Sequence, residues 1–282
     1  MKTIGFIDYY LDEFHADKYP AWIEQASGGA MQVKYAYGMK DRDNGMTNRD
    51  WCDRHGIELL DSIEEVVRSS DYLVVLSPDH PEFHEELSRL PLQSGKPTYI
   101  DKTFAPDRDT AVRLFELASQ HGTPMYSTSA LRFAEEYAAV DKNGIAAISS
   151  WGPGRFENYS IHQIEPIVSL MGSSPKRVMY TGIPAAASLV IDFGEGKQAD
   201  IHHLGRGCPF ALGVTYDSGE CQFIKQESDF FAAFTRNLVS FFETGKPAVD
   251  PQETVAVIAI IECGFKAAQR PFEWIEILGT RS

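Results

Sequence analysis

The stretch from Asp71 to Phe104, DYLVVLSPDHPEFHEELSRLPLQSGKPTYIDKTF, decides the fold that this sequence predicts. Its β-branched and aromatic run from Tyr72 to Leu76 is typical of a strand buried on both faces of a parallel sheet. We expect a helix from about Pro81 to Leu90, after which Gly95-Lys96-Pro97 leads into a second short strand, Thr98 to Ile100. This order of elements is a β-α-β unit.

Two charged residues, Asp101 and Lys102, directly follow the second strand. They therefore lie at the carboxyl edge of the predicted sheet, where open α/β sheets place their ligand crevice. A lysine at that edge can be partly desolvated, which makes it a usable proton donor near neutral pH. The alternative, which spacing alone favours, is a solvated lysine at the start of the next helix.

The turn between the first strand, Thr3 to Ile7, and the first helix, Phe14 to Ala26, contains no glycine. A dinucleotide-binding domain has G-x-G-x-x-G there, because bare backbone must approach the pyrophosphate. This chain has Asp8-Tyr-Tyr-Leu-Asp-Glu13 instead, with three carboxylates. A carboxylate about 5 Å from a phosphate charge, at an effective dielectric of about 20, would cost roughly 3 kcal/mol. A pyrophosphate in the usual seat is disfavoured unless these carboxylates point away.

Two further features of the first half have a functional and a structural interpretation. Gly38 follows the predicted second strand where an acidic residue would bind the ribose, and Asp41 is a candidate for that role or part of a solvated loop. His80 and His84 have the spacing of metal ligands on one helix face. Pro81 lies between them and no carboxylate-histidine framework is evident. We therefore expect no metal site.

The residues from Ser77 to Phe133 resemble the nucleotide-domain signature of a known family. The segments SP…H…GKPTYIDKTF and APDRDTAVRLFELASQHGTPMYSTSALRF are similar to that of the glucose-fructose oxidoreductase / inositol dehydrogenase (Gfo/Idh/MocA) family. There, a strand ends in Glu-Lys-Pro and an Arg-Phe pair follows the next strand. Asp101-Lys102-Thr103 and Arg132-Phe133 stand at these two places.

This resemblance implies a catalytic lysine at Lys102 and a site for NAD or NADP. The residues that it implies for cofactor binding are Asp8, Tyr9, Tyr10, Ser77, Pro78, Asp101 and Lys102.

A second resemblance lies in NYSIHQIEPIVSLMG, which begins at Asn158 and is similar to the family's D-x-G-x-H-x-x-D stretch. His162 matches the histidine, Glu165 replaces the second aspartate, and Asn158 replaces the catalytic aspartate. The resemblance implies acid-base catalysis by His162 with Asn158 beside it. An amide lacks the charge that stabilises an imidazolium, so His162 would be a weaker base than in the family pattern. A half-buried, hydrogen-bonded histidine is the alternative.

The chain from Lys176 to Phe223 alternates short apolar segments with turns, which favours an antiparallel sheet with one face against helices. The resemblance implies substrate binding over this sheet, with Arg132, Glu165 and His202 as candidate ligands. Exposed strand surface is the other interpretation of His202. Phe230 to Glu243 has an apolar stripe typical of a core helix, and Asp250-Pro251 begins the last long helix.

The fold that the resemblance implies is α/β: a Rossmann-like doubly wound parallel sheet, followed by an α/β domain with a mostly antiparallel open sheet. We assign residues 1–128 to the nucleotide-binding-type domain and residues 129–282 to the substrate and oligomerisation domain. Family members commonly associate through the second sheet, so a homo-oligomer, dimer or tetramer, is implied.

Composition excludes several classes of partner. The chain has 282 residues, a formal charge of −14 and a pI near 5.0. This charge opposes binding to nucleic acid or to an anionic membrane. The start of the chain, Met1-Lys-Thr, leads into a strand rather than a signal peptide, and no apolar run is long enough for a membrane span. Four scattered cysteines favour free thiols. We expect a cytoplasmic protein.

Two hypotheses follow for the function. The first is an NAD(P)-dependent oxidoreductase acting on a sugar, polyol or related hydroxyl compound, in which Lys102 and His162 meet across a shared cleft. The second is a non-catalytic ligand-binding or regulatory protein that kept the fold but lost conventional dinucleotide binding. The glycine-free loop, Asn158 and Thr103 in place of proline favour the second.

Overall fold

The computed structural model describes residues 1–277, which divide into two compact units. The first unit contains Met1–Thr128 together with Ala232–Pro251, and the second contains Ser129–Phe231 and the residues from Gln252 onward. Residues 232–251, which we assigned to the second domain, therefore pack with the first unit, while the second unit begins at Ser129.

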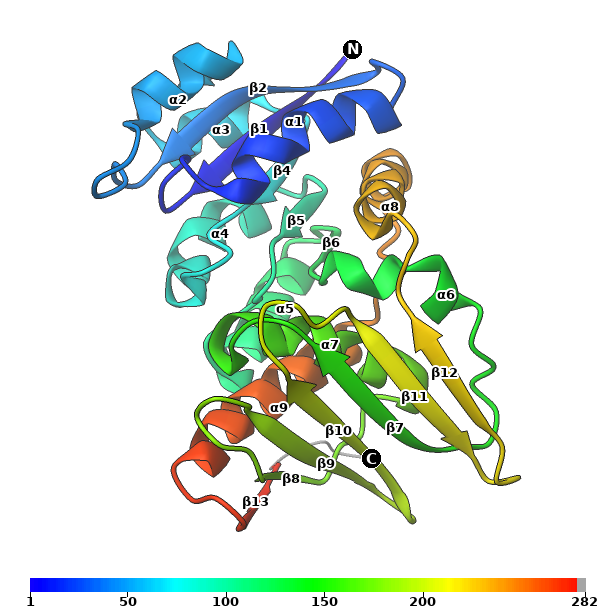
Figure 1. The fold of residues 1–282 in the computed structure, drawn as a ribbon. Coiled ribbons are helices and arrows are strands. Elements are labelled where there is room, and N and C mark those ends of the chain that lie inside the picture. The colour runs from blue at the N-terminus through cyan, green and yellow to red at the C-terminus, as the bar shows by residue number, and fades with distance from the viewer. Residues whose placement is uncertain (278–282) are drawn as a thin grey trace. The chain divides into compact units, whose positions relative to one another are not determined.

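The first unit is built on a six-stranded sheet in which every strand pair is parallel. The order across the sheet is β3-β2-β1-β4-β5-β6, and Figure 1 labels all of these strands except β3. Its strands are β1 (Lys2–Asp8), β2 (Met31–Gly38), β3 (Glu58–Leu59), β4 (Tyr72–Val75), β5 (Thr98–Ile100) and β6 (Met125–Tyr126). Chain order reverses at β1, which lies between β2 and β4. A doubly wound sheet offers its ligand crevice at the carboxyl ends of the strands on either side of such a reversal.

The helices of the first unit begin where local capping signals occur. Glu13 caps α1 (Phe14–Ala26), Thr47 caps α2 (Asn48–His55), Ser62 caps α3 (Ile63–Ser69) and Asp107 caps α5 (Arg108–Gln120). A side-chain oxygen satisfies an orphan N–H of the first turn at each of these ends. Between β4 and β5 the predicted helix forms as a short 3-10 turn, η1 (Pro81–Phe83), followed by α4 (His84–Gln93).

Helix α8 (Phe230–Thr244) carries the predicted phenylalanine stripe into the core of the first unit. Phe234 lies 5.7 Å from Tyr19 between ring centroids, and Phe242 stacks on Tyr72 at 4.9 Å. Burying an aromatic side chain removes a large apolar area from water. This packing explains why a segment that follows the second sheet in sequence belongs to the first unit.

The second unit is built on a seven-stranded sheet of order β12-β11-β7-β10-β9-β8-β13. All its strand pairs are antiparallel except β7 with β10, which is parallel. The strands are β7 (Ile145–Gly152), β8 (Arg177–Tyr180), β9 (Ser188–Gly194), β10 (Lys197–His203), β11 (Ala211–Tyr216), β12 (Cys221–Lys225) and β13 (Trp274–Glu276). The predicted fold class, a parallel sheet followed by a mostly antiparallel one, is confirmed.

Two helices, α7 (Phe156–Met171) and α9 (Pro251–Ala268), share a core with one face of this second sheet. Ile161, Ile164 and Val168 of α7 are buried in it, as the helical spacing predicted. Shorter helical turns, η2 (Ala130–Phe133) and α6 (Glu135–Ala138), open the unit. No helix within residues 1–277 is long and apolar enough to cross a bilayer. The four cysteines are free thiols, as predicted.

Candidate functional site

Asp101 is the centre of a buried polar network at the carboxyl end of β5. Its carboxylate has no exposure to solvent and accepts hydrogen bonds from the Lys102 backbone N–H at 2.8 Å and the Tyr99 hydroxyl at 3.1 Å. It also forms an ion pair with the His15 ring. Burial would raise the pKa of Asp101, but His15 and Lys102 outweigh it and hold that pKa below its usual value. Asp101 is therefore a carboxylate at neutral pH.

The side chain of Lys102 points back over the end of β4. Its Nζ lies 3.2 Å from the carbonyl oxygen of Pro78 and 3.4 Å from Asp79 Oδ1, and the residue is 8% exposed. An ammonium group has three N–H donors. Two of them have acceptors among the described residues, which leaves one to hydrogen-bond a ligand hydroxyl. Asp101 fixes the backbone of Lys102, so the lysine is held in place rather than being a solvated residue.

His15 belongs to this network, although the sequence analysis did not select it. Its ring stacks on Tyr19, with centroids 5.1 Å apart and planes 7° apart, and its Nδ1 faces Asp101. Burial lowers the pKa of His15, but Asp101 and Glu13 outweigh this effect and place the pKa above its usual value. The first turn of α1 thus supplies a histidine, with a pKa above its usual value, that holds the carboxylate behind Lys102.

Side-chain oxygens take backbone N–H groups both in the loop between β1 and α1 and in the first turn of α1. Glu13 accepts hydrogen bonds from the N–H groups of His15, at 2.8 Å, and of Ala16. Asp8 Oδ1 accepts from Tyr9 N at 2.7 Å, and the Asn48 side chain accepts from Leu11 N at 2.9 Å. These are donors that a dinucleotide-binding loop and helix would offer to phosphate.

The carboxyl groups of Asp8 and Glu13 are close enough to interact electrostatically, and both have raised pKa values. Burial raises the pKa of Glu13 to about 7, and burial together with Glu13 raises the pKa of Asp8 well above its usual range. Asp8 is 1% exposed, and its Oδ2 has no hydrogen-bond partner among residues 1–277. These acidic side chains therefore lie at the phosphate seat, which we define as the β1–α1 loop and the first-turn N–H groups of His15 and Ala16.

The other predicted cofactor residues line the same edge. The Tyr9 ring stacks on Phe83 with a centroid distance of 4.1 Å and a tilt of 14°, and the Tyr10 hydroxyl lies 3.4 Å from His80 Nε2. Ser77 has a φ of 77° and donates to the His80 carbonyl oxygen at 3.0 Å. This bend directs the next carbonyl, that of Pro78, at Lys102.

A hollow of about 320 Å³ lies where β2 and β3 end, and Tyr37, Gly38, Asp41 and Asn48 line part of it. This is where an α/β sheet of this type receives the adenosine half of a dinucleotide. Asp41 accepts from the Asn48 backbone N–H at 2.7 Å, so the candidate ribose ligand also anchors the start of α2.

The residues present fit one part of NAD or NADP and not another. The hollow beside Gly38 lies where the adenosine half would bind, and Lys102 lies at the carboxyl end of β5. The pyrophosphate does not fit while Glu13 occupies the first turn of α1, because the N–H groups that would bind it are taken.

In the second unit, His162 lies on α7 with its Nδ1 2.7 Å from the Ser129 hydroxyl and its ring near Tyr159 and Phe210. Asn158 is exposed one helical turn earlier on the same face. The prediction that His162 and Lys102 act on one substrate stays a prediction, since they belong to different units.

The three predicted substrate ligands all have partners within the protein. Arg132 forms an ion pair with Glu165 at 3.1 Å and a second with Glu253. His202 lies between Ser188 and Asp200, with distances of 2.8 Å and 2.7 Å. Buried ion pairs such as Arg132 with Glu165 are costly to break. The role of Arg132, Glu165 and His202 in substrate binding stays a prediction.

His84, one of the two candidate metal ligands, faces two carbonyl oxygens instead of a metal. Its ring nitrogens lie 2.9 Å from the Phe104 oxygen and 2.5 Å from the Leu76 oxygen. Within the described part of the chain, no group of three or more potential ligands is placed to hold a metal ion.

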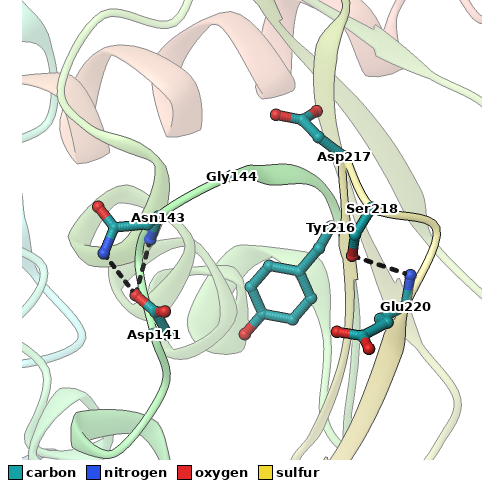
Figure 2. Close-up of a pocket in the computed structure, with 7 residues that line it drawn as sticks. All are labelled: Asp141, Asn143, Gly144, Tyr216, Asp217, Ser218 and Glu220. Atoms are coloured by element: carbon teal, nitrogen blue, oxygen red, sulfur yellow. Dashed lines mark hydrogen bonds between the residues drawn. The ribbon is translucent and has the colours of Figure 1, made fainter.

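A second hollow, of about 390 Å³, lies in the second unit beside the turn between β11 and β12 (Figure 2). It is lined by Asp141, Asn143, Gly144, Tyr216, Asp217, Ser218 and Glu220. None of the predicted site residues lines it, and its three carboxylates would repel an anionic ligand. The chemistry-bearing residues thus gather elsewhere, at the carboxyl edge of the first sheet and on α7.

No family model and no curated protein sequence matches this chain. Solved structures do match it over nearly its whole length. Scyllo-inositol dehydrogenase from Lactobacillus casei matches with a TM-score of 0.80 and 13% identity, covering 99% of each chain. A probable dehydrogenase from Thermotoga maritima matches with a TM-score of 0.79 and 14% identity, covering 98% of each.

GenD2 from gentamicin A biosynthesis, solved in complex with NAD, matches with a TM-score of 0.75 and 13% identity, over 98% of this chain and 97% of that one. Identities this low establish the fold alone. The chain therefore has the fold of the Gfo/Idh/MocA-type dehydrogenases, as its motifs predicted.

Proposed function

We propose that this chain is an NAD(P)-dependent oxidoreductase acting on a sugar, polyol or related hydroxyl compound. The observation that carries this proposal is Lys102, held at the carboxyl edge of the first sheet by Asp101 and left with one N–H donor for a ligand. A positioned ammonium of this kind can hydrogen-bond a substrate hydroxyl and favour its deprotonation. The dehydrogenase fold over the whole chain supports the same conclusion.

In this proposal Lys102 binds the oxygen that reacts, and His162 accepts the hydroxyl proton. The Ser129 hydroxyl lies 2.7 Å from Nδ1 of His162 and orients its ring. Asn158, in place of a carboxylate, leaves the imidazolium without a neighbouring negative charge at that position. A bound nicotinamide would supply the redox chemistry.

The experiment that tests the proposal is a titration of the purified protein with NADH and with NADPH, followed by nicotinamide fluorescence. Saturable binding to either nucleotide, and reduction of NAD or NADP by a member of a polyol and sugar panel, are expected. The titration should be repeated from pH 6 to pH 8.5, because this range includes the pKa of Glu13, which is raised to about 7. Absence of both binding and turnover at every pH would contradict the proposal.

A second candidate is a non-catalytic ligand-binding or regulatory protein. The capping of α1 by Glu13 favours it, because the conventional pyrophosphate seat is filled by the chain itself. In this case a polyol or sugar would still stabilise the protein against heat, whereas neither nucleotide would bind. The same titration, with a thermal shift assay added, separates the two candidates.

We also propose that the chain self-associates, as a dimer or tetramer, through the second sheet. Phe223 of β12 is 67% exposed, and its ring lies 5.8 Å from that of Trp151 on β7. Exposed aromatic side chains are enriched at protein interfaces. Light scattering after gel filtration should give a multiple of the 31.5 kDa chain mass, and Phe223→Glu should shift the protein toward the monomer.

A further inference from the structure

We propose that the Glu13 carboxylate is a built-in occupant of the phosphate seat, so that a dinucleotide phosphate can bind at α1 only when this side chain leaves the first turn. The inference rests on the proposed use of NAD(P), and it adds a residue that controls when the nucleotide binds. Three observations in the first unit support it.

The first observation is competition for the same donors. Glu13 spans the start of α1 and takes the N–H groups of His15 and Ala16. Helix amino ends bind phosphate through such first-turn N–H groups and through the helix dipole. A carboxylate that already accepts these hydrogen bonds is a chemical stand-in for the phosphate.

The second observation is an unsatisfied group beside this seat. Asp8 is 1% exposed, yet its Oδ2 has no hydrogen-bond partner within the described residues. Burial and the neighbouring Glu13 favour the neutral form by raising the pKa of Asp8. Asp8 Oδ2 is thus a buried polar atom that lacks a partner in the described part of the chain while Glu13 holds the first turn, and a ligand bound there would supply one.

The third observation is that displacement concerns one side chain. The loop itself is anchored independently of Glu13, since Asn48 binds Leu11 N and Asp8 binds Tyr9 N. Glu13 keeps some exposure to solvent, so the inference requires only a rotation of this side chain with the loop backbone unchanged.

Several titratable groups surround Glu13, and they set the pH at which it releases the seat. Asp8 comes from β1, Asp101 follows β5, His15 lies on α1 itself, and the hydroxyls of Tyr10 and Tyr19 are also near enough to interact. Burial raises the pKa of Glu13 to about 7. Its negative charge, and with it the competition against phosphate, should therefore grow as pH rises through that value.

The experiment measures NADH affinity at pH 8 for the native protein and for Glu13→Ala, Glu13→Gln and Glu24→Ala. Glu24 is exposed on the same helix, and a rise of about 1.5 Å per residue places it roughly 16 Å further along. Its variant therefore removes the same charge far from the seat. We expect Glu13→Ala to bind about tenfold to a hundredfold more tightly than the native protein and Glu24→Ala to bind like it.

Glu13→Gln separates charge from hydrogen bonding, because its amide oxygen can still accept from α1. It should gain less than Glu13→Ala, and it also tests the inference if the alanine variant folds poorly. At pH 6 the advantage of both variants over the native protein should shrink, since the native Glu13 is then mostly protonated.

Inorganic pyrophosphate serves as a second probe, read by calorimetry. If Glu13→Ala gains pyrophosphate binding but no variant binds NADH, the occupied seat is confirmed while the oxidoreductase proposal fails. If the native protein binds NADH as tightly as Glu13→Ala, the inference is wrong and the proposed function stands. If Glu13→Ala and Glu13→Gln gain neither ligand, the inference is also wrong.

Discussion

The ends of β1 and β5 lie at one edge of the same sheet, yet they relate to the dehydrogenase pattern in different ways. At β5 the Asp101-Lys102 pair matches the family motif in position, and the lysine is held as a donor for a ligand. At β1 the glycine loop has been replaced by side chains that bind their own backbone.

The two ends are also joined, because His15 in the first turn of α1 pairs with Asp101. The comparison teaches that the altered loop has become part of the support for the lysine. A substitution at the end of β1 should therefore change the stability or activity that depends on the end of β5, and the following predictions test that link.

The largest expected effect is on catalysis at the β5 end. Lys102→Ala removes the donor to the substrate hydroxyl and should lower kcat about 10² to 10⁴-fold, the range for a positioned acid-base group. Lys34→Ala, at an exposed position on β2, is the matched control and should leave turnover unchanged. Steady-state kinetics on the substrate found in the panel measure both, and equal activity of the two variants would contradict a catalytic role for Lys102.

The next effect is on stability, through the pair that joins the two ends. Asp101→Asn leaves the buried His15 charge without its counterion, and breaking such a pair typically costs about 3 to 5 kcal/mol. Chemical denaturation measures the free energy of unfolding. The control is Asp71→Asn at the opposite edge of the sheet, where Asp71 pairs with exposed Lys2. The loss of unfolding free energy in Asp71→Asn should be several times smaller. Equal losses in both variants would mean that the buried network around Asp101 stabilises the fold no more than a surface ion pair does.

The pH dependence of stability should distinguish the two ends. Glu13 has a folded pKa near 7 against an ordinary value of 4.5, so the folded state holds an extra proton between these values. The raised pKa of Glu13 stabilises the folded state at pH 4.5, and this stabilisation is lost as pH rises through 7. His15, with a raised pKa, acts in the same direction above 6.5, whereas Asp101, with a lowered pKa, opposes it only below 3.8.

The contribution of Glu13 to the unfolding free energy should therefore decline from pH 5 to pH 8.5, whereas His84 and His203, whose pKa values burial lowers, act in the opposite direction as pH rises toward 6.5. Glu13→Gln, which cannot ionise, should recover about 1 to 3 kcal/mol at pH 8.5 relative to the native protein. At pH 5 the two proteins should differ less. An equal difference in stability between the two proteins at pH 5 and at pH 8.5 would show that the folded state does not raise the pKa of Glu13.

The smallest expected effect on stability concerns the second unit. His162→Gln keeps a polar side chain near Ser129 but removes the titratable ring. If His162 is the base, the acidic limb of the pH profile of kcat/KM should disappear in this variant, while the stability changes little. An unchanged pH profile would assign His162 to structure alone.

The elements that the sequence predicted well are those that begin or end at local signals, such as helix caps and short apolar runs. The Asp107 cap and the following Gly122 define α5 at its observed bounds, and the apolar run around Tyr72 gives β4. At α3, Ser62 accepts from Glu65 N as the capping box predicts, although the Glu65 carboxylate binds Asp61 N instead of Ser62 N. These elements depend on neighbours within a few residues, which a sequence displays directly.

Contacts between distant residues could not be predicted in the same way. His15 and Asp101 are 86 positions apart, and no periodicity links them. The stripe on α8 predicted burial but not which sheet it would cover, and the parallel pairing of β7 with β10 has no local signature. The one available hint at His15 was its place in the first turn after the altered loop, since that turn faces the strand ends.

Gly38 has a consequence for anyone wishing to re-engineer this scaffold. A Cβ atom there would lie 2.4 Å from the side chain of Asn48, the residue that tethers Leu11. An aspartate introduced at position 38 to bind a ribose would thus displace the Asn48 side chain, and the turn at Leu11 would lose its hydrogen bond to Asn48. Any such redesign has to trim position 48 in the same step and find the turn a new anchor.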